Sequence, residues 1–175
     1  TIEKGFMTFR PFWEALKPHM DKPMLIHFRW ATHGLVDKDN CHPFKVAPDL
    51  AMIHNGIING IEGVDALTSD TNAFVKHYVG PMNRGNPLII YSEYGKLVLE
   101  KLIGSGSKLV FLNKKGKAVI INEVAGNWES GVGYSNDSHL HPQVRYSTQY
   151  YGCAPASAYG KPYCSKPKAT ANDIV

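Results

Sequence analysis

The chain has 175 residues, of which 43% are hydrophobic, so we expect one domain of ordinary size with a buried core, followed by a tail. Its net charge of +4 is spread along the chain, which argues against nucleic-acid binding, and no apolar run is long enough to cross a bilayer. An odd number of cysteines, three, and a first segment without an apolar stretch argue against a disulfide scaffold and a signal peptide, and favour a cytoplasmic protein.

The first half of the chain is predicted to contain a helix and two strands. Residues 8–20 are typical of a short helix, and Thr8 is expected to cap it. The apolar run 23–31 has no helical period and therefore predicts a buried strand. The turn-rich segment 35–49 is expected to be a loop, and the short apolar run 50–54 predicts a second strand.

Two helices are predicted next, over 69–82 and 92–104. Ser69 or Asp70 is expected to cap the first helix, and Gly80 with Pro81 is expected to end it. Gly104 is expected to end the second.

The rest of the chain changes character in three steps. Residues 108–123 contain two apolar runs around a glycine-containing turn, which predicts a β-hairpin. The segment 127–137 is glycine-rich and is expected to be irregular. From 138 to 175 the composition is rich in Ala, Pro, Ser and Lys, which predicts a flexible or loosely packed tail.

Residues that can supply polar groups lie at the ends of the predicted strands and at a helix start: Arg29, His33, His54, Asn55, Gly56 (through its backbone) and Asp70. An arginine can hold a carboxylate through two parallel hydrogen bonds, and Asp70 could hold an ammonium group. The amide of Asn55 and the backbone N–H of Gly56 offer two donors for a developing oxyanion. The residues alone therefore suggest acyl transfer on an α-amino acid.

Each of these residues also has a purely structural interpretation. Arg29 could form an ion pair, Asn55–Gly56 is a common turn dipeptide, and Asp70 could simply cap a helix. His33, His42 and His54 taken singly are typical of hydrogen-bonded structural histidines. Only their order and spacing along the chain favour a common site.

Four motifs, in this order, decide between these interpretations: "HFRWATHG" (27–34), "NCHPF" (40–44), "HNGIING" (54–60) and "SDTNAFVKHYV" (69–79). Together they resemble the class II glutamine amidotransferase domain of the N-terminal-nucleophile type, most closely the glutaminase domain of glucosamine-6-phosphate synthase. The resemblance covers roughly residues 5 to 135. The gap between Gly60 and Ser69 is short, which suggests a compact member of the family, similar to small bacterial and phage proteins. It implies an α/β (α+β) fold, a four-layer αββα sandwich that here lacks its first strand or strands.

The resemblance also implies a role for each matching residue. Arg29 would hold the α-carboxylate of glutamine, with Thr32 and His33 shaping the pocket and Trp30 supporting it or forming a mobile wall. Asp70 would hold the α-amine. As catalytic residues, Asn55 and Gly56 would form the oxyanion hole. Asn40 and His42 match a family segment as well, and we assign them to structuring a loop.

The family's nucleophile is a cysteine at the mature N-terminus, and this chain begins with Thr1. Three explanations stay open: a preceding segment carries the cysteine, Thr1 is the nucleophile, or the domain binds without catalysing. The first is favoured because residues 3–7 resemble an interior strand of the family. Cys41 is expected to be a packed thiol, since adjacent residues such as Cys41 and His42 usually point apart on an extended segment.

We therefore predict an amidotransferase domain over residues 1–137 and a tail over 138–175. Its function would be hydrolysis of L-glutamine, with release of ammonia to an acceptor or synthase partner that the sequence does not identify. The alternative is a catalytically inactive domain that binds a ligand or a protein. No cofactor and no metal are expected. The zinc ligands that the sequence could offer are widely spaced, in the predicted tail: His139, His141, Cys153 and Cys164.

Overall fold

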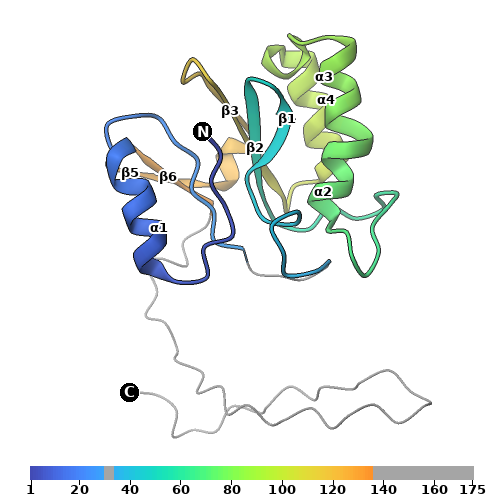
Figure 1. Ribbon diagram of the computed structural model, residues 1–175. Coiled ribbons are helices and arrows are strands. Elements are labelled where there is room, and N and C mark those ends of the chain that lie inside the picture. Colours follow the sequence, from blue (N-terminus) through green and yellow to red (C-terminus); the bar gives the residue numbers. More distant parts are fainter. Residues whose placement is uncertain (30–33, 136–175) are drawn as a thin grey trace, which may run out of the picture. The chain divides into compact units, whose positions relative to one another are not determined.

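The computed structural model describes residues 1–29 and 34–135. A four-stranded antiparallel sheet in the order β1-β2-β3-β4 lies at its centre (Figure 1). Its strands are β1 (Phe44–Ala47), β2 (Leu50–Asn55), β3 (Lys108–Asn113) and β4 (Ala118–Ile121). Helices and antiparallel strands thus occur in one chain, which confirms the α+β class. The predicted tail and the predicted site residues Trp30, Thr32 and His33 lie outside the described residues.

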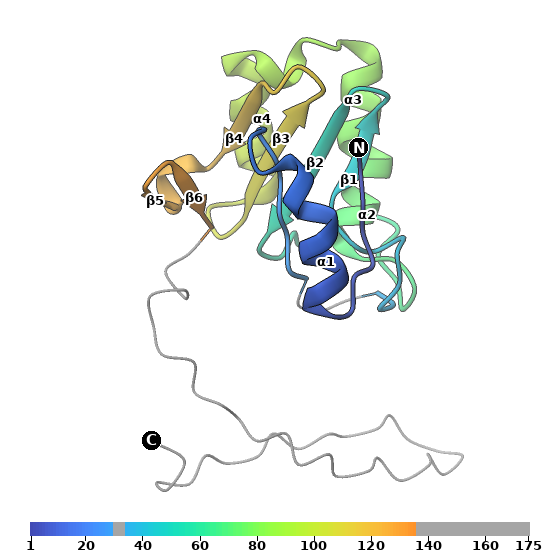
Figure 2. The same ribbon diagram turned by 60° about the vertical axis from the view of Figure 1, so that its left-hand side comes forward.

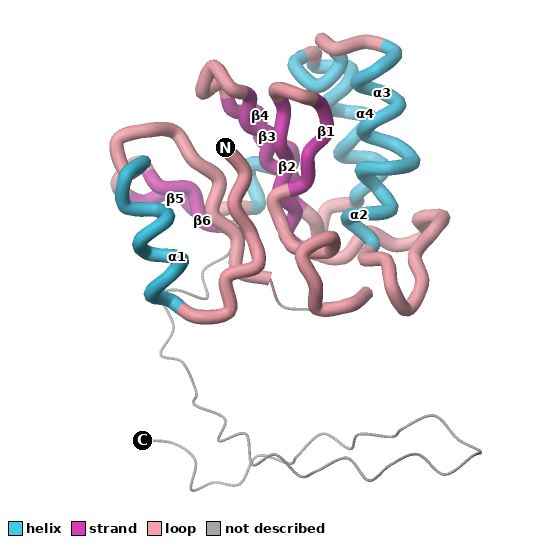
Figure 3. The backbone as a smooth tube through the Cα atoms, in the orientation of Figure 1, coloured by secondary structure: helices cyan, strands magenta, loops and turns pink. Residues whose placement is uncertain are grey.

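Helices cover the sheet unequally on its two faces. The helices α2 (Asp70–Phe74), α3 (Gly80–Gly85) and α4 (Glu93–Ile103) lie on one face, whereas α1 (Phe9–Leu16) and the N-terminal segment lie on the other (Figures 1 and 2). A small hairpin of β5 (Asn127–Glu129) and β6 (Val132–Tyr134) forms a separate two-stranded sheet (Figure 3). Short 3-10 turns occupy Lys17–His19, Ile89–Tyr91 and Glu123–Ala125.

The core lies between the sheet and α2–α4, because the strands alternate in burial. Along β2, Leu50, Met52 and His54 are buried while the residues between them are half-buried. Phe74 and Leu99 pack against this face from the helices and are fully buried. The second face of the sheet also carries apolar side chains, which are half-buried: Ala51, Ile53, Val110, Leu112 and Ile120. Both faces of the sheet are therefore apolar.

The helix predicted over 69–82 begins as expected and ends later than expected. The Ser69 hydroxyl accepts a hydrogen bond from the backbone N–H of Asn72 at 3.2 Å, so Ser69 is the N-cap. The chain then stays helical to Gly85, through a π-helical segment at Val75–Val79. The expected end at Gly80–Pro81 was wrong, because Pro81 lies in the first turn of α3, where a residue without an N–H is tolerated.

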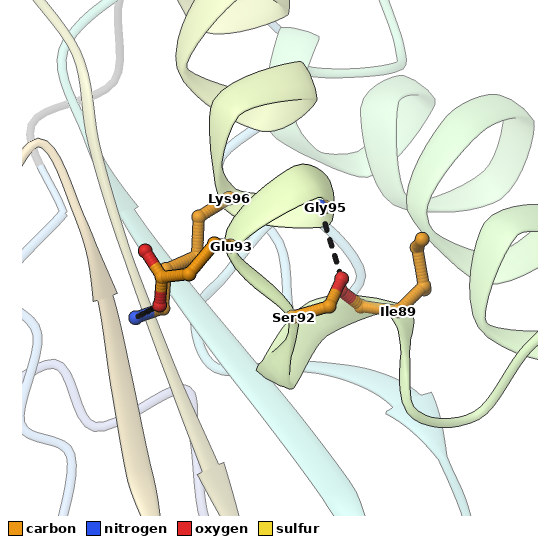
Figure 4. A network of polar contacts seen from close by, with 5 residues as sticks. All are labelled: Ile89, Ser92, Glu93, Gly95 and Lys96. Atoms are coloured by element: carbon orange, nitrogen blue, oxygen red, sulfur yellow. Dashed lines mark hydrogen bonds and ion pairs between the residues drawn. The ribbon is translucent and has the colours of Figure 1, made fainter.

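Helix α4 begins at a serine cap and ends at the glycine that the sequence predicts. The Ser92 hydroxyl accepts from the backbone N–H of Gly95 at 3.0 Å and donates to the Ile89 carbonyl at 2.7 Å (Figure 4). Gly95 must lack a side chain, since an added Cβ would overlap the Ile89 carbonyl oxygen. Gly104 ends the helix with φ +72°, as predicted.

A Ser92→Ala variant is expected to lose about 1 kcal/mol of unfolding free energy, the usual cost of removing a helix N-cap. Urea unfolding at neutral pH measures this. Glu93→Gln is the matched control, because it removes the exposed ion pair with Lys96 on the same turn (Figure 4), which should change stability by less than about 0.5 kcal/mol. Equal losses for the two variants would contradict the capping role.

Several other predicted elements can be compared with the structure. The strand β2 and the β3–β4 hairpin are confirmed. The strand predicted at 23–31 was wrong over its described part, which is irregular, with Ile26 and Phe28 exposed. An apolar run predicts burial, but a strand also needs an edge to pair with, and local sequence does not show one. Thr8 precedes α1 without a side-chain cap bond.

Two segments expected to be loops contain strands instead. Residues 44–47 form β1, which pairs antiparallel with β2, and 127–134 form the β5–β6 hairpin. Within the part of the chain that the structure describes, no helix is long and apolar enough to cross a membrane.

Candidate functional site

The Asn55–Gly56 corner lies where β2 leaves the sheet. Asn55 is the last paired residue of β2, opposite Lys108 of β3. Gly56 follows with φ +124°, and a Cβ there would lie 2.5 Å from the Ser107 hydroxyl oxygen and 2.8 Å from the Gly106 carbonyl oxygen. Only glycine fits this combination of backbone angle and space. The corner is not a two-residue hairpin turn, because the chain continues into a long connection before β3.

Asp70 is hydrogen-bonded to the segment that follows this corner. It is the first residue of α2, is 8% exposed, and its Oδ2 accepts from the backbone N–H of Ile58 at 2.8 Å. Its Oδ1 accepts from the backbone N–H of Thr71 at 2.7 Å. A helix N-terminus is a favourable place for a carboxylate. Ser69 rather than Asp70 is the cap, so the Asp70 carboxylate is available for the hydrogen bond to Ile58.

A second contact connects the helix start to the end of β2. The Thr71 hydroxyl oxygen lies 2.8 Å from Nδ1 of His54 and 3.3 Å from Oδ1 of Asp70. His54 is 3% exposed, and it immediately precedes Asn55. Asp70 raises the pKa of His54, but burial outweighs this effect and leaves the pKa below its ordinary value. The segment 54–58 and the start of α2 thus form one hydrogen-bonded unit.

Three histidines from separate segments meet next to this unit. The ring centroids of His27 and His42 are 3.8 Å apart, and those of His42 and His54 are 6.5 Å apart. Both ring nitrogens of His42 and Nε2 of His54 are buried without a hydrogen-bond partner among the described residues. Burial, helped by the neighbouring imidazoles and by Arg29, lowers the pKa of His27 to about 4 and that of His42 to about 2.

Sequence reasoning missed this cluster, since it treated the histidines singly. We define it as the histidine cluster: His27, His42 and His54. No local spacing signals it, because each imidazole comes from a different part of the chain. Its members are all neutral near pH 7, and among the described residues no group of three or more metal-binding side chains is placed to hold an ion.

Arg29 lies near enough to the histidine cluster for its charge to act on His27 and His42. Its Nη1 donates to the Leu35 carbonyl at 2.9 Å, and the backbone N–H of Leu35 points to the Leu67 carbonyl at 3.4 Å. The segment that holds Arg29 is therefore attached to the loop that leads into Ser69 and Asp70. The charge of Arg29 also contributes to the low pKa of His27.

Asn40 joins two loops, as predicted. Its side chain is 2% exposed, its Nδ2 donates to the Leu67 carbonyl at 2.7 Å, and its Oδ1 accepts from the backbone N–H of Ser69 at 2.8 Å. These bonds fix the position of Ser69, and with it the start of α2. His42 in the same motif belongs to the histidine cluster as well as to the loop.

A cavity of about 1210 Å³ opens between the N-terminal segment and the second face of the sheet. Its lining includes His27, Arg29, Cys41, His42 and the β2 residue Ala51. Of the site residues that the structure describes, only Arg29 lines it, so the cavity does not join Arg29 to the Asn55–Gly56 corner or to Asp70. Arg29, the Asn55–Gly56 corner and Asp70 are connected instead by the loop contacts and the histidine cluster described above.

The residues described above thus form a glycine corner at the end of β2, with a buried carboxylate hydrogen-bonded to the segment that follows it and an arginine near the histidine cluster. Comparison with known proteins gives partial similarities. Proteins named glutamine–fructose-6-phosphate aminotransferase (isomerizing) match the chain in Buchnera aphidicola subsp. Baizongia pistaciae, with 35% identity over 98 residues, and in Saccharomyces cerevisiae, with 31% identity over 122 residues. The matches cover 49% and 55% of this chain, but 15% and 17% of the relatives.

A shorter match to the protein of the same name in Idiomarina loihiensis is 47% identical over 38 residues, or 22% of this chain and 6% of the relative. No protein-family model and no solved structure matches the chain. The chain therefore spans less than a fifth of the length of these relatives, and the similarity suggests a relation to glutamine-dependent aminotransferases.

Proposed function

We propose that the chain is a glutamine-hydrolysing domain of the class II amidotransferase type, which releases ammonia from the side-chain amide of glutamine for transfer to an acceptor. One observation carries this proposal: the hydrogen bond from Ile58 N–H to Asp70, which holds the expected amine-binding carboxylate beside the expected oxyanion corner. The partial similarity to aminotransferases named for glutamine supports the same assignment.

In this proposal each residue has a defined task. Arg29 binds the α-carboxylate of glutamine and Asp70 binds its α-ammonium group. Trp30, Thr32 and His33 complete the pocket. When a nucleophile attacks the side-chain amide, the Asn55 amide and the Gly56 N–H stabilise the negative charge that develops on the oxygen. Gly56 is an exposed residue, which is compatible with contact between its backbone and a substrate.

The nucleophile in this proposal is a cysteine at a mature N-terminus preceding Thr1. Its α-amine takes the thiol proton and returns it to the leaving nitrogen, so that ammonia departs and a thioester remains. Water then cleaves the thioester to glutamate and regenerates the thiol. The N-terminal residue of the mature protein tests this step directly, and a residue other than cysteine would remove it.

The four-layer sandwich and the division at residue 137 are part of the same proposal. The half-buried apolar second face of the sheet supports the sandwich, because such a face stabilises a fold when another sheet covers it. The large cavity lies over this face, beside Arg29. A second sheet that included the nucleophile's strand would place the cysteine near the site.

Glutamate release from L-glutamine by the mature protein tests the function. An Arg29→Ala variant is expected to bind glutamine more weakly by about 2–4 kcal/mol, or about 30-fold to 1000-fold, because a charge-assisted pair of hydrogen bonds is lost. Isothermal titration calorimetry measures the affinity. Arg10→Ala on the exposed surface of α1 is the control and should keep it. An unchanged affinity in Arg29→Ala would exclude the assigned role.

The alternative, a domain that binds a ligand or a protein without catalysis, is favoured by the exposed aromatic side chains around α1. Phe9 is 67% exposed and Phe28 is 75% exposed, although both belong to a cluster with Phe12. Such a surface is typical of an interaction site. If glutamine raises the melting temperature of the mature protein and no glutamate is released, this alternative holds.

A further inference from the structure

Ser107 joins the start of β3 to the Asn55–Gly56 corner. Its side chain is fully buried, and its hydroxyl donates to the Ile57 carbonyl at 3.0 Å, across 50 positions of sequence. Its own carbonyl accepts from the Asn122 side-chain amide at 2.7 Å, and that amide also donates to Gly104 at 2.9 Å. The backbone of Ser107 is therefore held in place by Asn122, the residue that follows β4.

The bonds to the corner meet on a single peptide group. The carbonyl of Ile57 and the N–H of Ile58 belong to the same planar unit. Ser107 holds its oxygen, and Asp70 holds its nitrogen from the opposite side. Since both ends are bonded, this peptide cannot rotate without breaking one of the two hydrogen bonds.

Fixing this peptide also fixes Gly56. On one side of Gly56 lies Asn55, which is paired with Lys108 in the sheet, and on the other side the held peptide follows Ile57. A glycine can adopt many backbone angles, so its N–H direction depends on such restraints. Gly56 also packs against Ser107 itself, since a Cβ there would lie 2.5 Å from the hydroxyl oxygen.

We propose that Ser107 is a positioning residue for amide hydrolysis, which keeps the Gly56 N–H and the Asn55 amide directed at the developing oxyanion. The inference rests on the proposed function and adds a residue outside the motifs that suggested it. A restraint on the oxyanion donors acts in the transition state, whereas glutamine in the ground state depends on Arg29 and Asp70.

The test is steady-state kinetics of glutamine hydrolysis by the mature protein, at a temperature well below unfolding. Ser107→Ala should lower kcat about 10-fold to 100-fold and leave KM within about twofold. Ser107→Cys keeps the approximate shape of the side chain but is a weaker hydrogen-bond donor. Its kcat should therefore lie between those of the wild type and Ser107→Ala. Ser105→Ala is the matched control, because Ser105 is exposed in the same turn and should keep both constants.

The outcomes separate the two proposals. If the wild type is active and Ser107→Ala keeps its kcat, or raises KM alone, the role of Ser107 is overturned and the proposed function stands. If the wild type releases no glutamate, the proposed function is overturned, and the catalytic role of Ser107 with it. Amide hydrogen exchange then still decides whether Ser107 holds the peptide: faster exchange at Ile58 in Ser107→Ala supports the restraint, and unchanged exchange contradicts it.

Discussion

A Gly56→Ala variant is expected to lose about 2–5 kcal/mol of unfolding free energy, the sum of a backbone term and a packing term. The backbone term arises because φ at Gly56 is +124°, where a side chain is strained. The packing term arises because the new Cβ would lie 2.8 Å from the Gly106 carbonyl oxygen and from the Ser107 Cα, which are backbone atoms that cannot rotate away. Urea unfolding measures the loss.

Gly60→Ala is the control for a glycine with positive φ that lacks the packing term. Gly60 belongs to the same loop and has φ +71°, but a Cβ there meets no atom within 4 Å. It should therefore show the backbone term alone, about 1–2 kcal/mol. A Gly56→Ala variant as stable as Gly60→Ala would mean that the corner does not pack against Ser107 as described. On the proposed function, a folded Gly56→Ala variant should still bind glutamine through Arg29 and should release glutamate far more slowly than the wild type.

The elements that could be predicted from the sequence are those whose signals are local. Helix α4 has its cap at Ser92 and its stop at Gly104, and the β3–β4 hairpin has alternating apolar residues on both sides of a glycine turn. The β5–β6 hairpin also has a local signal, the turn dipeptide Ser130–Gly131. Ser130 and Gly131 both have positive φ, which is the two-residue turn that matches the twist of a hairpin.

Other features depend on partners that are distant in the sequence. Strand β1 is a strand because β2 pairs with it, and the four residues Phe44–Ala47 alone do not indicate this. The contact of Asp70 with Ile58 depends on the path of the loop between them, so residue types could suggest the carboxylate's chemistry but not its neighbour. The resemblance to a family supplied only the expectation that Asp70 shares a site with Asn55 and Gly56.

The histidine cluster is expected to make the protein sensitive to acid. An unfolded imidazole has a pKa of about 6.5, whereas the pKa in the folded state is about 4 for His27 and about 2 for His42. Below pH 6.5 the unfolded chain therefore binds protons that the folded chain does not, and stability falls as the pH falls. Each imidazole costs about 1.4 kcal/mol per pH unit in this range, so His27 and His42 together remove about 4 kcal/mol at pH 5.

The direction of the pKa shifts follows from the groups around the histidine cluster. Arg29 and Lys4 are the cations that oppose a proton on His42, and its neighbouring imidazoles oppose it too. Asp70 is the group that favours a proton, and it acts on His54. Because burial is the largest cause for every member, the pKa of His54 is lowered as well, and it adds to the loss in the same direction.

Urea unfolding at pH 7.5 and pH 5 measures the effect, in a window where aspartate and glutamate side chains stay ionised. His42→Gln should reduce the loss between the two pH values by about 2 kcal/mol, because one buried imidazole no longer titrates. His77→Gln is the matched control: His77 is exposed on the helical segment after α2, and its replacement should leave the pH dependence as in the wild type. Equal stability of the wild type at both pH values would show that protons reach these imidazoles in the folded protein, so the cluster would not be buried as described.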